Sequence, residues 1–141
     1  MKSTILRIQH IIQEDGSLDN RMKNLTDAMS KVRGLILKSS DYDCNGVPTV
    51  WFDFDTVHNL NVFLWAGCKR WFDISDRSHW AVSLDRGDPN ATCNNIGVVL
   101  YLLDCHEPDI HIKSLSNGIE GFLSDRCLEQ YYDIEYWRKK E

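Results

Sequence analysis

The sequence lacks the signals that mark a membrane protein, a secreted protein or a disulfide-stabilised one. No stretch approaches the roughly 18 consecutive apolar residues of a membrane span. Arg7, Gln9 and His10 interrupt the apolar residues near the N-terminus, so we expect no signal peptide. The five cysteines are odd in number and form no C-x-x-C pair, which disfavours a disulfide framework and a structural zinc site. We therefore expect reduced thiols and a cytoplasmic protein without a membrane partner.

The sequence is also poor in positive charge and in the breaks that separate domains. Its 21 acidic and 16 basic side chains give a formal net charge of −5, whereas direct binding to a nucleic acid needs a concentrated positive surface. An acidic surface speeds encounter with a basic protein, although the same charge also serves solubility. Only three prolines occur, and no segment is of low complexity. We expect a single globular domain over residues 1–141.

Motifs of the common enzyme classes are absent as well. The sequence contains no G-x-x-x-x-G-K-[ST], G-x-G-x-x-G, G-x-S-x-G or H-E-x-x-H. Asp53-x-Asp55 places two carboxylates on one face of a strand, as acid/base or metal chemistry requires, but a solvated strand face explains the same pattern. Cys105-His106 pairs a thiol with a base, yet neighbouring residues in a strand point apart. We predict no metal and no cofactor.

What the sequence does contain is a series of strand-like segments between two helical ones. From Ser17, a good N-cap, apolar residues recur at three- and four-residue intervals up to Gly34, which predicts the first helix. Asn117 and Glu120 resemble a capping box, which predicts a second helix that reaches Gln130. Aromatic and β-branched residues between turn-rich junctions predict strands over residues 35–38, 50–55, 62–66, 70–75, 80–85, 96–103 and 110–113. Residues 4–12 fit either a strand or a short helix.

This order of elements predicts an α+β domain. We expect a single, mostly antiparallel sheet with an N-terminal and a C-terminal helix packed on it. Residues 96–103 are apolar on both faces, which is typical of a strand that is covered on both sides.

Two similar runs, Trp51-Phe52-Asp53 and Trp71-Phe72-Asp73, stand twenty positions apart. Alternate side chains of a strand share a face, so each tryptophan and aspartate point away from the phenylalanine between them. A face with two tryptophans among aspartates suits a basic protein partner, because tryptophan is enriched among binding hot spots. The alternative is that a helix covers this face, in which case the aspartates need pairing. The predicted partner-binding residues are Trp51, Asp53, Asp55, Trp71 and Asp73, with Asp41, Asp43 and Asp76 at the rim.

The C-terminal half resembles the SUKH superfamily. The likeness rests on Trp80–Asp85, Gly97–Tyr101, Asp104, Glu107–Asp109, Ser114–Ser116 and Ile119–Leu123, a strand pair followed by a closing helix with a Phe-Leu step. The N-terminal half departs from the family pattern, since no Leu-Pro step follows the first helix. Many members of this family are bacterial immunity proteins, which bind and neutralise a cognate toxin that is often a nuclease. The resemblance implies that class of function, but it carries over no individual site residue.

The favoured hypothesis is an immunity-type protein that covers the basic substrate cleft of a toxin and catalyses nothing itself. A second hypothesis is a small metal-dependent hydrolase or nuclease that uses aspartates and a histidine, and divalent-metal binding separates it from the first. A third is an adaptor domain whose tail, Tyr131–Trp137, docks elsewhere. The sequence leaves the oligomeric state open.

Overall fold

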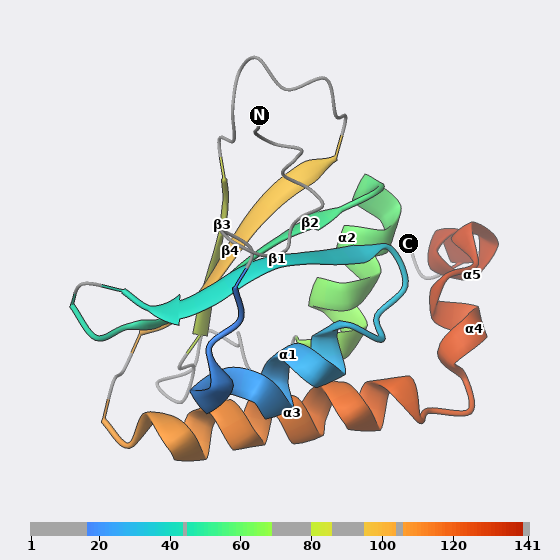
Figure 1. The fold of residues 1–141 in the computed structure, drawn as a ribbon. Coiled ribbons are helices and arrows are strands. Elements are labelled where there is room, and N and C mark those ends of the chain that lie inside the picture. Colours follow the sequence, from blue (N-terminus) through green and yellow to red (C-terminus); the bar gives the residue numbers. More distant parts are fainter. Residues whose placement is uncertain (1–16, 44, 69–79, 86–94, 104–105, 140–141) are drawn as a thin grey trace.

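The fold has two layers, a four-stranded sheet and a set of helices that pack on one of its faces (Figure 1). The structure is a computed structural model that describes residues 17–43, 45–68, 80–85, 95–103 and 106–139. The sheet has the order β1-β2-β4-β3, and each neighbouring pair of strands is antiparallel. The predicted α+β fold with an antiparallel sheet is therefore confirmed. The strands are β1 (Leu35–Tyr42), β2 (Pro48–Phe54), β3 (Trp80–Leu84) and β4 (Ile96–Leu102).

Capping side chains and a proline, all visible in the sequence, mark the start of several helices. The Asp19 carboxylate accepts the N–H of Arg21 (2.8 Å), and the Thr56 hydroxyl accepts that of Asn59 (3.1 Å). Pro108 is the first residue of the longest helix, where its missing N–H costs no hydrogen bond. The helical elements are the 3₁₀ turn η1 (Asn20–Met22), α1 (Lys23–Met29), α2 (Val57–Val62), the π-helical turn η2 (Phe63–Gly67), α3 (Pro108–Leu123), α4 (Leu128–Tyr131) and α5 (Ile134–Lys139).

The first helical segment is shorter than predicted. Its apolar stripe is buried as expected, with Met22 and Met29 fully inside the core. The segment is capped by Asp19 rather than Ser17, however, and its α-helix ends at Met29 rather than at Gly34. Gly34 instead has a φ of 83° and leads directly into β1.

The strand predicted over residues 62–66 is wrong, because this segment is helical. It covers the end of α2 and most of η2. The buried residues Leu60, Phe63 and Gly67 recur at three- and four-residue intervals, which is the spacing of one helix face. The helical period therefore overrides the β-branched and aromatic composition that favoured a strand.

The strand predicted over residues 110–113 and the helix start predicted at Asn117 are also wrong. Both lie inside α3, which begins at Pro108 and ends at Leu123 instead of reaching Gln130. Its buried face consists of Ile112, Leu115, Ser116, Ile119 and Phe122. The remaining strand predictions that can be compared, residues 35–38, 50–55, 80–85 and 96–103, fall on β1, β2, β3 and β4. The predictions for residues 4–12 and 70–75 lie outside the described residues.

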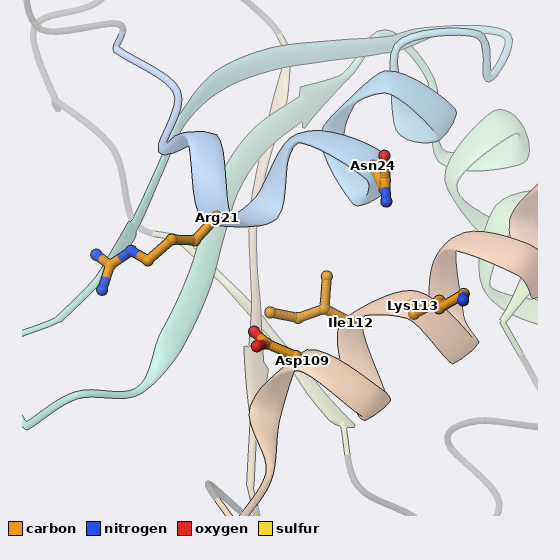
Figure 2. Close-up of a pocket in the computed structure, with 5 residues that line it drawn as sticks. All are labelled: Arg21, Asn24, Asp109, Ile112 and Lys113. Carbon is orange, nitrogen blue, oxygen red and sulfur yellow. The ribbon is translucent and has the colours of Figure 1, made fainter.

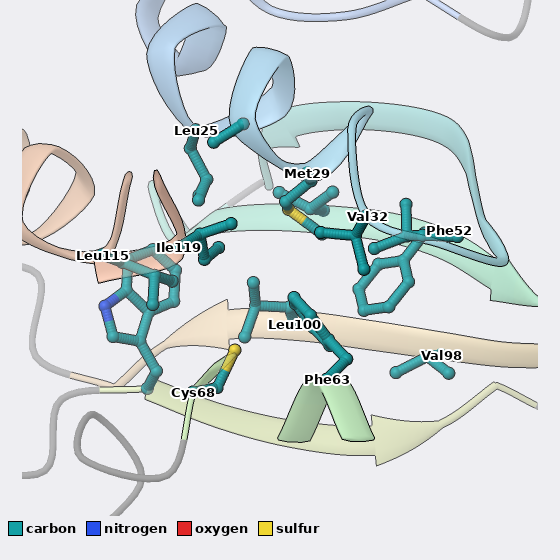
Figure 3. Packing of buried hydrophobic residues seen from close by; sticks show 14 of the residues in the cluster. Leu25, Met29, Val32, Phe52, Phe63, Cys68, Val98, Leu100, Leu115 and Ile119 are labelled. Carbon is teal, nitrogen blue, oxygen red and sulfur yellow. The ribbon is translucent and has the colours of Figure 1, made fainter. Parts of the chain in front are cut away.

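The hydrophobic core lies between the sheet and the helices (Figure 3). Figure 3 shows Leu25 and Met29 of α1 and Leu115 of α3 across the core from Leu100 of the sheet. Three aromatic rings fill its centre: the Phe52 ring is 5.9 Å from that of Phe54 and 6.0 Å from that of Phe63, in edge-to-face contacts. The sheet is thus fixed to α1, α2 and α3 through one of its two faces.

Cysteine reactivity offers a test of this core. Cys68 is fully buried, and burial raises the pKa of its thiol, whereas Cys127 is half-buried. Thiolates react and buried thiols do not, so we expect iodoacetamide to modify Cys127 in the folded protein more than about tenfold faster than Cys68. Mass spectrometry of the two peptides measures both rates, and denaturant provides the control, since it should equalise them. Equal rates in the folded protein would contradict this packing.

Candidate protein-binding surface

The two faces of the sheet differ in burial. In β2, Val50, Phe52 and Phe54 are buried against the helices, whereas Trp51 and Asp53 retain partial exposure on the opposite face. The predicted alternation of this strand is therefore confirmed. The core residues of α1, α2 and α3 all pack on the side of Phe52, so these helices do not cover Trp51. We call the side of Trp51 the outer face of the sheet.

The strand register identifies the other residues of the outer face, because directly paired residues of antiparallel strands share a face. Trp51 pairs with Val99 of β4, and Val99 pairs in turn with Ser83 of β3. Tyr101, two residues along β4, lies on the same face and pairs with Ala81. Trp51, Val99, Ala81 and Tyr101 are all half-buried. The centre of the outer face is therefore apolar and aromatic, and it lies on the middle strands β2 and β4 and on the neighbouring strand β3.

Carboxylates stand at one end of this aromatic centre. Asp53 pairs with Gly97, and the N–H of Asp85 donates to the carbonyl oxygen of Gly97 (2.8 Å) from the other side. A Cβ placed on Gly97 would lie 3.7 Å from Oδ1 of Asp53 and 3.2 Å from Cβ of Asp85. The two acidic side chains therefore lie on either side of Gly97, which has no side chain of its own. Asp41, exposed at the far end of β1, adds a third carboxylate beyond the other end of the centre.

Among the residues that the structure describes, Lys38 brings a cation to this acidic end. The register of β1 against β2 shifts between Leu37 and Ser39, so Lys38 is the extra residue of a β-bulge. Its Nζ lies 3.9 Å from Oδ2 of Asp53, and both side chains keep some exposure (37% and 17%). Such a pair contributes about 0–1 kcal/mol, so a cation from a partner can replace Lys38 at low cost.

Two of the predicted site residues serve local structure. Asp55 lies just past the end of β2, where its N–H donates to the Gly34 carbonyl (3.0 Å) and its Oδ1 accepts from Nδ2 of Asn59 (2.9 Å). Asp43 lies in the β1–β2 hairpin, where its Oδ1 accepts the N–H of Asn45 (2.8 Å) and that of Val47 (3.0 Å). The Asp55 carboxylate therefore bonds a residue of α2, and the Asp43 carboxylate bonds within the hairpin.

Of the remaining predicted residues, Trp51, Asp53 and Asp41 are placed on or beside the outer face, and Trp71, Asp73 and Asp76 lie outside the described residues. Sequence reasoning missed Asp85 and Tyr101. Their signal was the period of two in the strands predicted at 80–85 and 96–103, which becomes useful only when the pairing of β3 with β4 is known.

A shallow groove on the helical layer is a weaker candidate. It is open to solvent and lined by Arg21, Asn24, Asp109, Ile112 and Lys113 (Figure 2). Figure 2 shows the guanidinium of Arg21 pointing away from Asn24 and Lys113. That guanidinium already binds its neighbours: it hydrogen-bonds the Asp19 carboxylate (2.5 and 3.0 Å) and lies 3.8 Å from the centre of the Tyr42 ring. It also lowers the pKa of Asp19. The groove therefore presents no convergent set of groups to a ligand.

The part of the chain that the structure describes contains no group of three or more histidine, cysteine, aspartate or glutamate side chains that could hold a metal ion. The described helices include none with the length and apolar character needed to cross a bilayer.

Tyr131 and Tyr132, near the C-terminus, pack on the domain itself. The Tyr131 ring stacks on that of Phe122 at 6.1 Å, and the guanidinium of Arg33 lies 4.0 Å from the centre of the Tyr132 ring. Nε2 of His58 is 2.8 Å from the carbonyl oxygen of Tyr132. Burial raises the pKa of the Tyr132 hydroxyl. Both tyrosines therefore pack within the fold. This packing argues against the hypothesis of a docking tail, because they are the first two residues of that tail.

Comparison of the chain with known proteins found no matching family model, no matching curated protein and no matching solved structure. The resemblance to the SUKH superfamily stays a prediction from the sequence.

Proposed function

We propose that this protein is an inhibitor of the immunity type, which binds a basic bacterial toxin domain, such as a nuclease, through the outer face of its sheet. The observation that supports the proposal is the half-buried Trp51–Tyr101 centre with carboxylates at both ends, on the sheet face opposite α1, α2 and α3. Tryptophan and tyrosine are enriched among the hot-spot residues at the centre of interfaces, and charges at the rim select the partner. In this proposal the inhibitor blocks the substrate cleft of the toxin and acts in the cytoplasm.

The charge of the surface favours a basic partner over a second copy of the chain. Asp41, Asp53 and Asp85 lie on or beside the outer face, and the whole chain carries a net charge of −5. Two copies that met through this face would bring these carboxylates together, and like charges across an interface cost several kcal/mol. A cleft that binds a nucleic acid is lined by lysine and arginine and therefore complements the same carboxylates.

The size of the face limits how the partner binds. Strands lie about 4.8 Å apart and rise about 3.3 Å per residue, so this sheet presents roughly 400 Å². A specific interface buries about 800 Å² on each partner. The partner must therefore extend past the strands, with the outer face as the centre of the interface.

The proposal predicts a salt-sensitive complex that one charge reversal weakens. The partner to test is the product of the adjacent gene, purified and titrated against this protein by calorimetry. We expect a one-to-one complex that weakens as salt rises. Asp53→Lys should raise Kd by about 10- to 100-fold, since it places like charge against a basic surface.

Asp27→Lys is the matched control, because it makes the same charge change at an exposed position of α1, which packs on the other face of the sheet. It should leave Kd within about twofold, as expected for a surface substitution outside the interface. Circular dichroism verifies that both variants fold. Equal effects of the two substitutions would refute the outer face as the site, and the absence of any complex in low salt would refute the inhibitor proposal with this partner.

A further inference from the structure

The chain contains two Asn-Gly pairs in different structural settings. Asn45-Gly46 lies in the hairpin between β1 and β2, and Asn117-Gly118 lies in the middle of α3. Asparagine is a chemically labile residue. Its side-chain amide is attacked by the backbone nitrogen of the next residue, and glycine in that place offers the least steric hindrance because it has no side chain.

The surroundings of the hairpin pair leave room for this reaction. Asn45 and Gly46 are both exposed. Gly46 has a φ of 77°, and a Cβ placed on it would meet nothing within 4 Å. The helical pair differs, because Asn117 and Gly118 are held by the hydrogen-bond ladder of a 16-residue helix, and the nitrogen of Gly118 reaches the side chain only if that helix opens.

One residue restrains the hairpin pair. The N–H of Gly46 donates to the carbonyl oxygen of Asp43 (2.8 Å). The Asp43 carboxylate in turn accepts from the N–H groups of Asn45 and Val47, and the N–H of Asp43 donates to the carbonyl oxygen of Val47 (2.9 Å). The nitrogen of Gly46 is therefore free to attack only when this turn opens, and the Asp43 carboxylate stabilises the closed form.

We propose that Asn45 is a site of spontaneous deamidation and that the Asp43 carboxylate sets its rate. The backbone nitrogen of Gly46 bonds to Cγ of Asn45 and gives its proton to water. The side-chain nitrogen takes up one proton from water, and its bond to Cγ breaks, so that one ammonia leaves. One water then opens the cyclic imide at either carbonyl, giving aspartate or isoaspartate. The sequence of steps consumes water, releases ammonia and changes no oxidation state.

The product differs from the original hairpin in charge and in backbone length. Aspartate and isoaspartate each add one carboxylate near Asp41 and Asp43, so the hairpin end of β1 becomes more negative. Isoaspartate also adds a methylene to the backbone between position 45 and Val47, whose N–H groups both donate to the Asp43 carboxylate. The inference is independent of the proposed function, because it concerns the chemistry of the hairpin and not a partner.

The test is to incubate the full-length protein in neutral buffer, digest it at intervals and follow both asparagine peptides by chromatography and mass spectrometry. We expect the Asn45 peptide to gain the mass of an amide-to-acid conversion and to separate into aspartate and isoaspartate forms. The Asn117 peptide should convert more than about tenfold more slowly, since each tenfold corresponds to ~1.4 kcal/mol of helix opening. Comparable rates at both positions would overturn the proposal.

Two alanine variants test the role of Asp43. Asp43→Ala removes the acceptor of two N–H groups, so it should speed conversion at Asn45 several-fold and leave the Asn117 peptide unchanged. Asp41→Ala removes the same charge nearby without touching the turn, and it should change neither rate. The Asn117 peptide reports general loosening of the fold. An unchanged Asn45 rate in Asp43→Ala, or an equal rise in both variants, would refute control by this carboxylate.

Discussion

Replacing Phe52 by alanine should lower the free energy of unfolding by about 3–5 kcal/mol, the largest effect we expect from a single substitution in this chain. Phe52 is 1% exposed and lies at the centre of the sheet layer. Its ring contacts those of Phe54 and Phe63 edge to face, so alanine leaves a cavity that two elements line. Domains of this size are stable by about 5–15 kcal/mol, so the variant should be close to unfolding at room temperature.

Denaturation in urea, followed by circular dichroism, measures this loss. Val57→Ala is the matched control, because Val57 is 61% exposed at the start of α2, and its effect should stay within about 0.5 kcal/mol. Phe52→Leu keeps most of the volume and should fall between the two. Equal midpoints for Phe52→Ala and Val57→Ala would show that Phe52 is not part of the core.

Replacing Gly34 by alanine should cost about 2–3 kcal/mol, for two separate reasons. The φ of 83° is unfavourable for a residue with a side chain, by about 1–2 kcal/mol. An added Cβ would also lie 2.4 Å from Oδ1 of Asp55 and 2.7 Å from Nδ2 of Asn59. The hydrogen bond between those side chains must then break, at a cost of about 1 kcal/mol.

Two other glycines allow the conformational cost and the steric cost to be measured separately. Gly46 has a φ of 77° but open space around it, so Gly46→Ala should cost only the conformational part, about 1–2 kcal/mol. Gly121 lies in α3, where a Cβ meets nothing within 4 Å, so Gly121→Ala should stabilise the protein by about 0.5–1 kcal/mol. Urea denaturation of the three variants should give that order. A Gly34→Ala variant no less stable than Gly46→Ala would contradict the close approach of Asp55 and Asn59.

The strands were predictable where one face is buried and the other is not. Val50, Phe52 and Phe54 alternate with Trp51 and Asp53, and such a period of two occurs only in an extended chain. The same reasoning failed at residues 110–113, because Ile110 and Ile112 alternate over a window too short to separate the two periods. The helical stripe becomes visible only when Leu115 and Ile119 are included.

The candidate site was predictable from the sequence only in part. The sequence identified Trp51 and Asp53, because both lie in one strand and their relation is local, and it also placed Asp41 at the rim. Asp85 and Tyr101 lie on other strands, and their place beside Trp51 depends on β2 pairing with β4 and β4 with β3. A single sequence does not contain that order of strands, since several pairings bury the same apolar residues.

The contacts that close the helical layer join the two ends of the described chain. Lys31 binds Glu120 across 89 residues, and Arg33 binds Glu129 across 96. The helix α1 packs on α3, and the four strands of the described sheet lie between these two helices in the sequence. During synthesis the sheet therefore emerges before α3 can pack on its core face. We expect the domain to complete its folding only after α3 has emerged, and to need protection from aggregation until then.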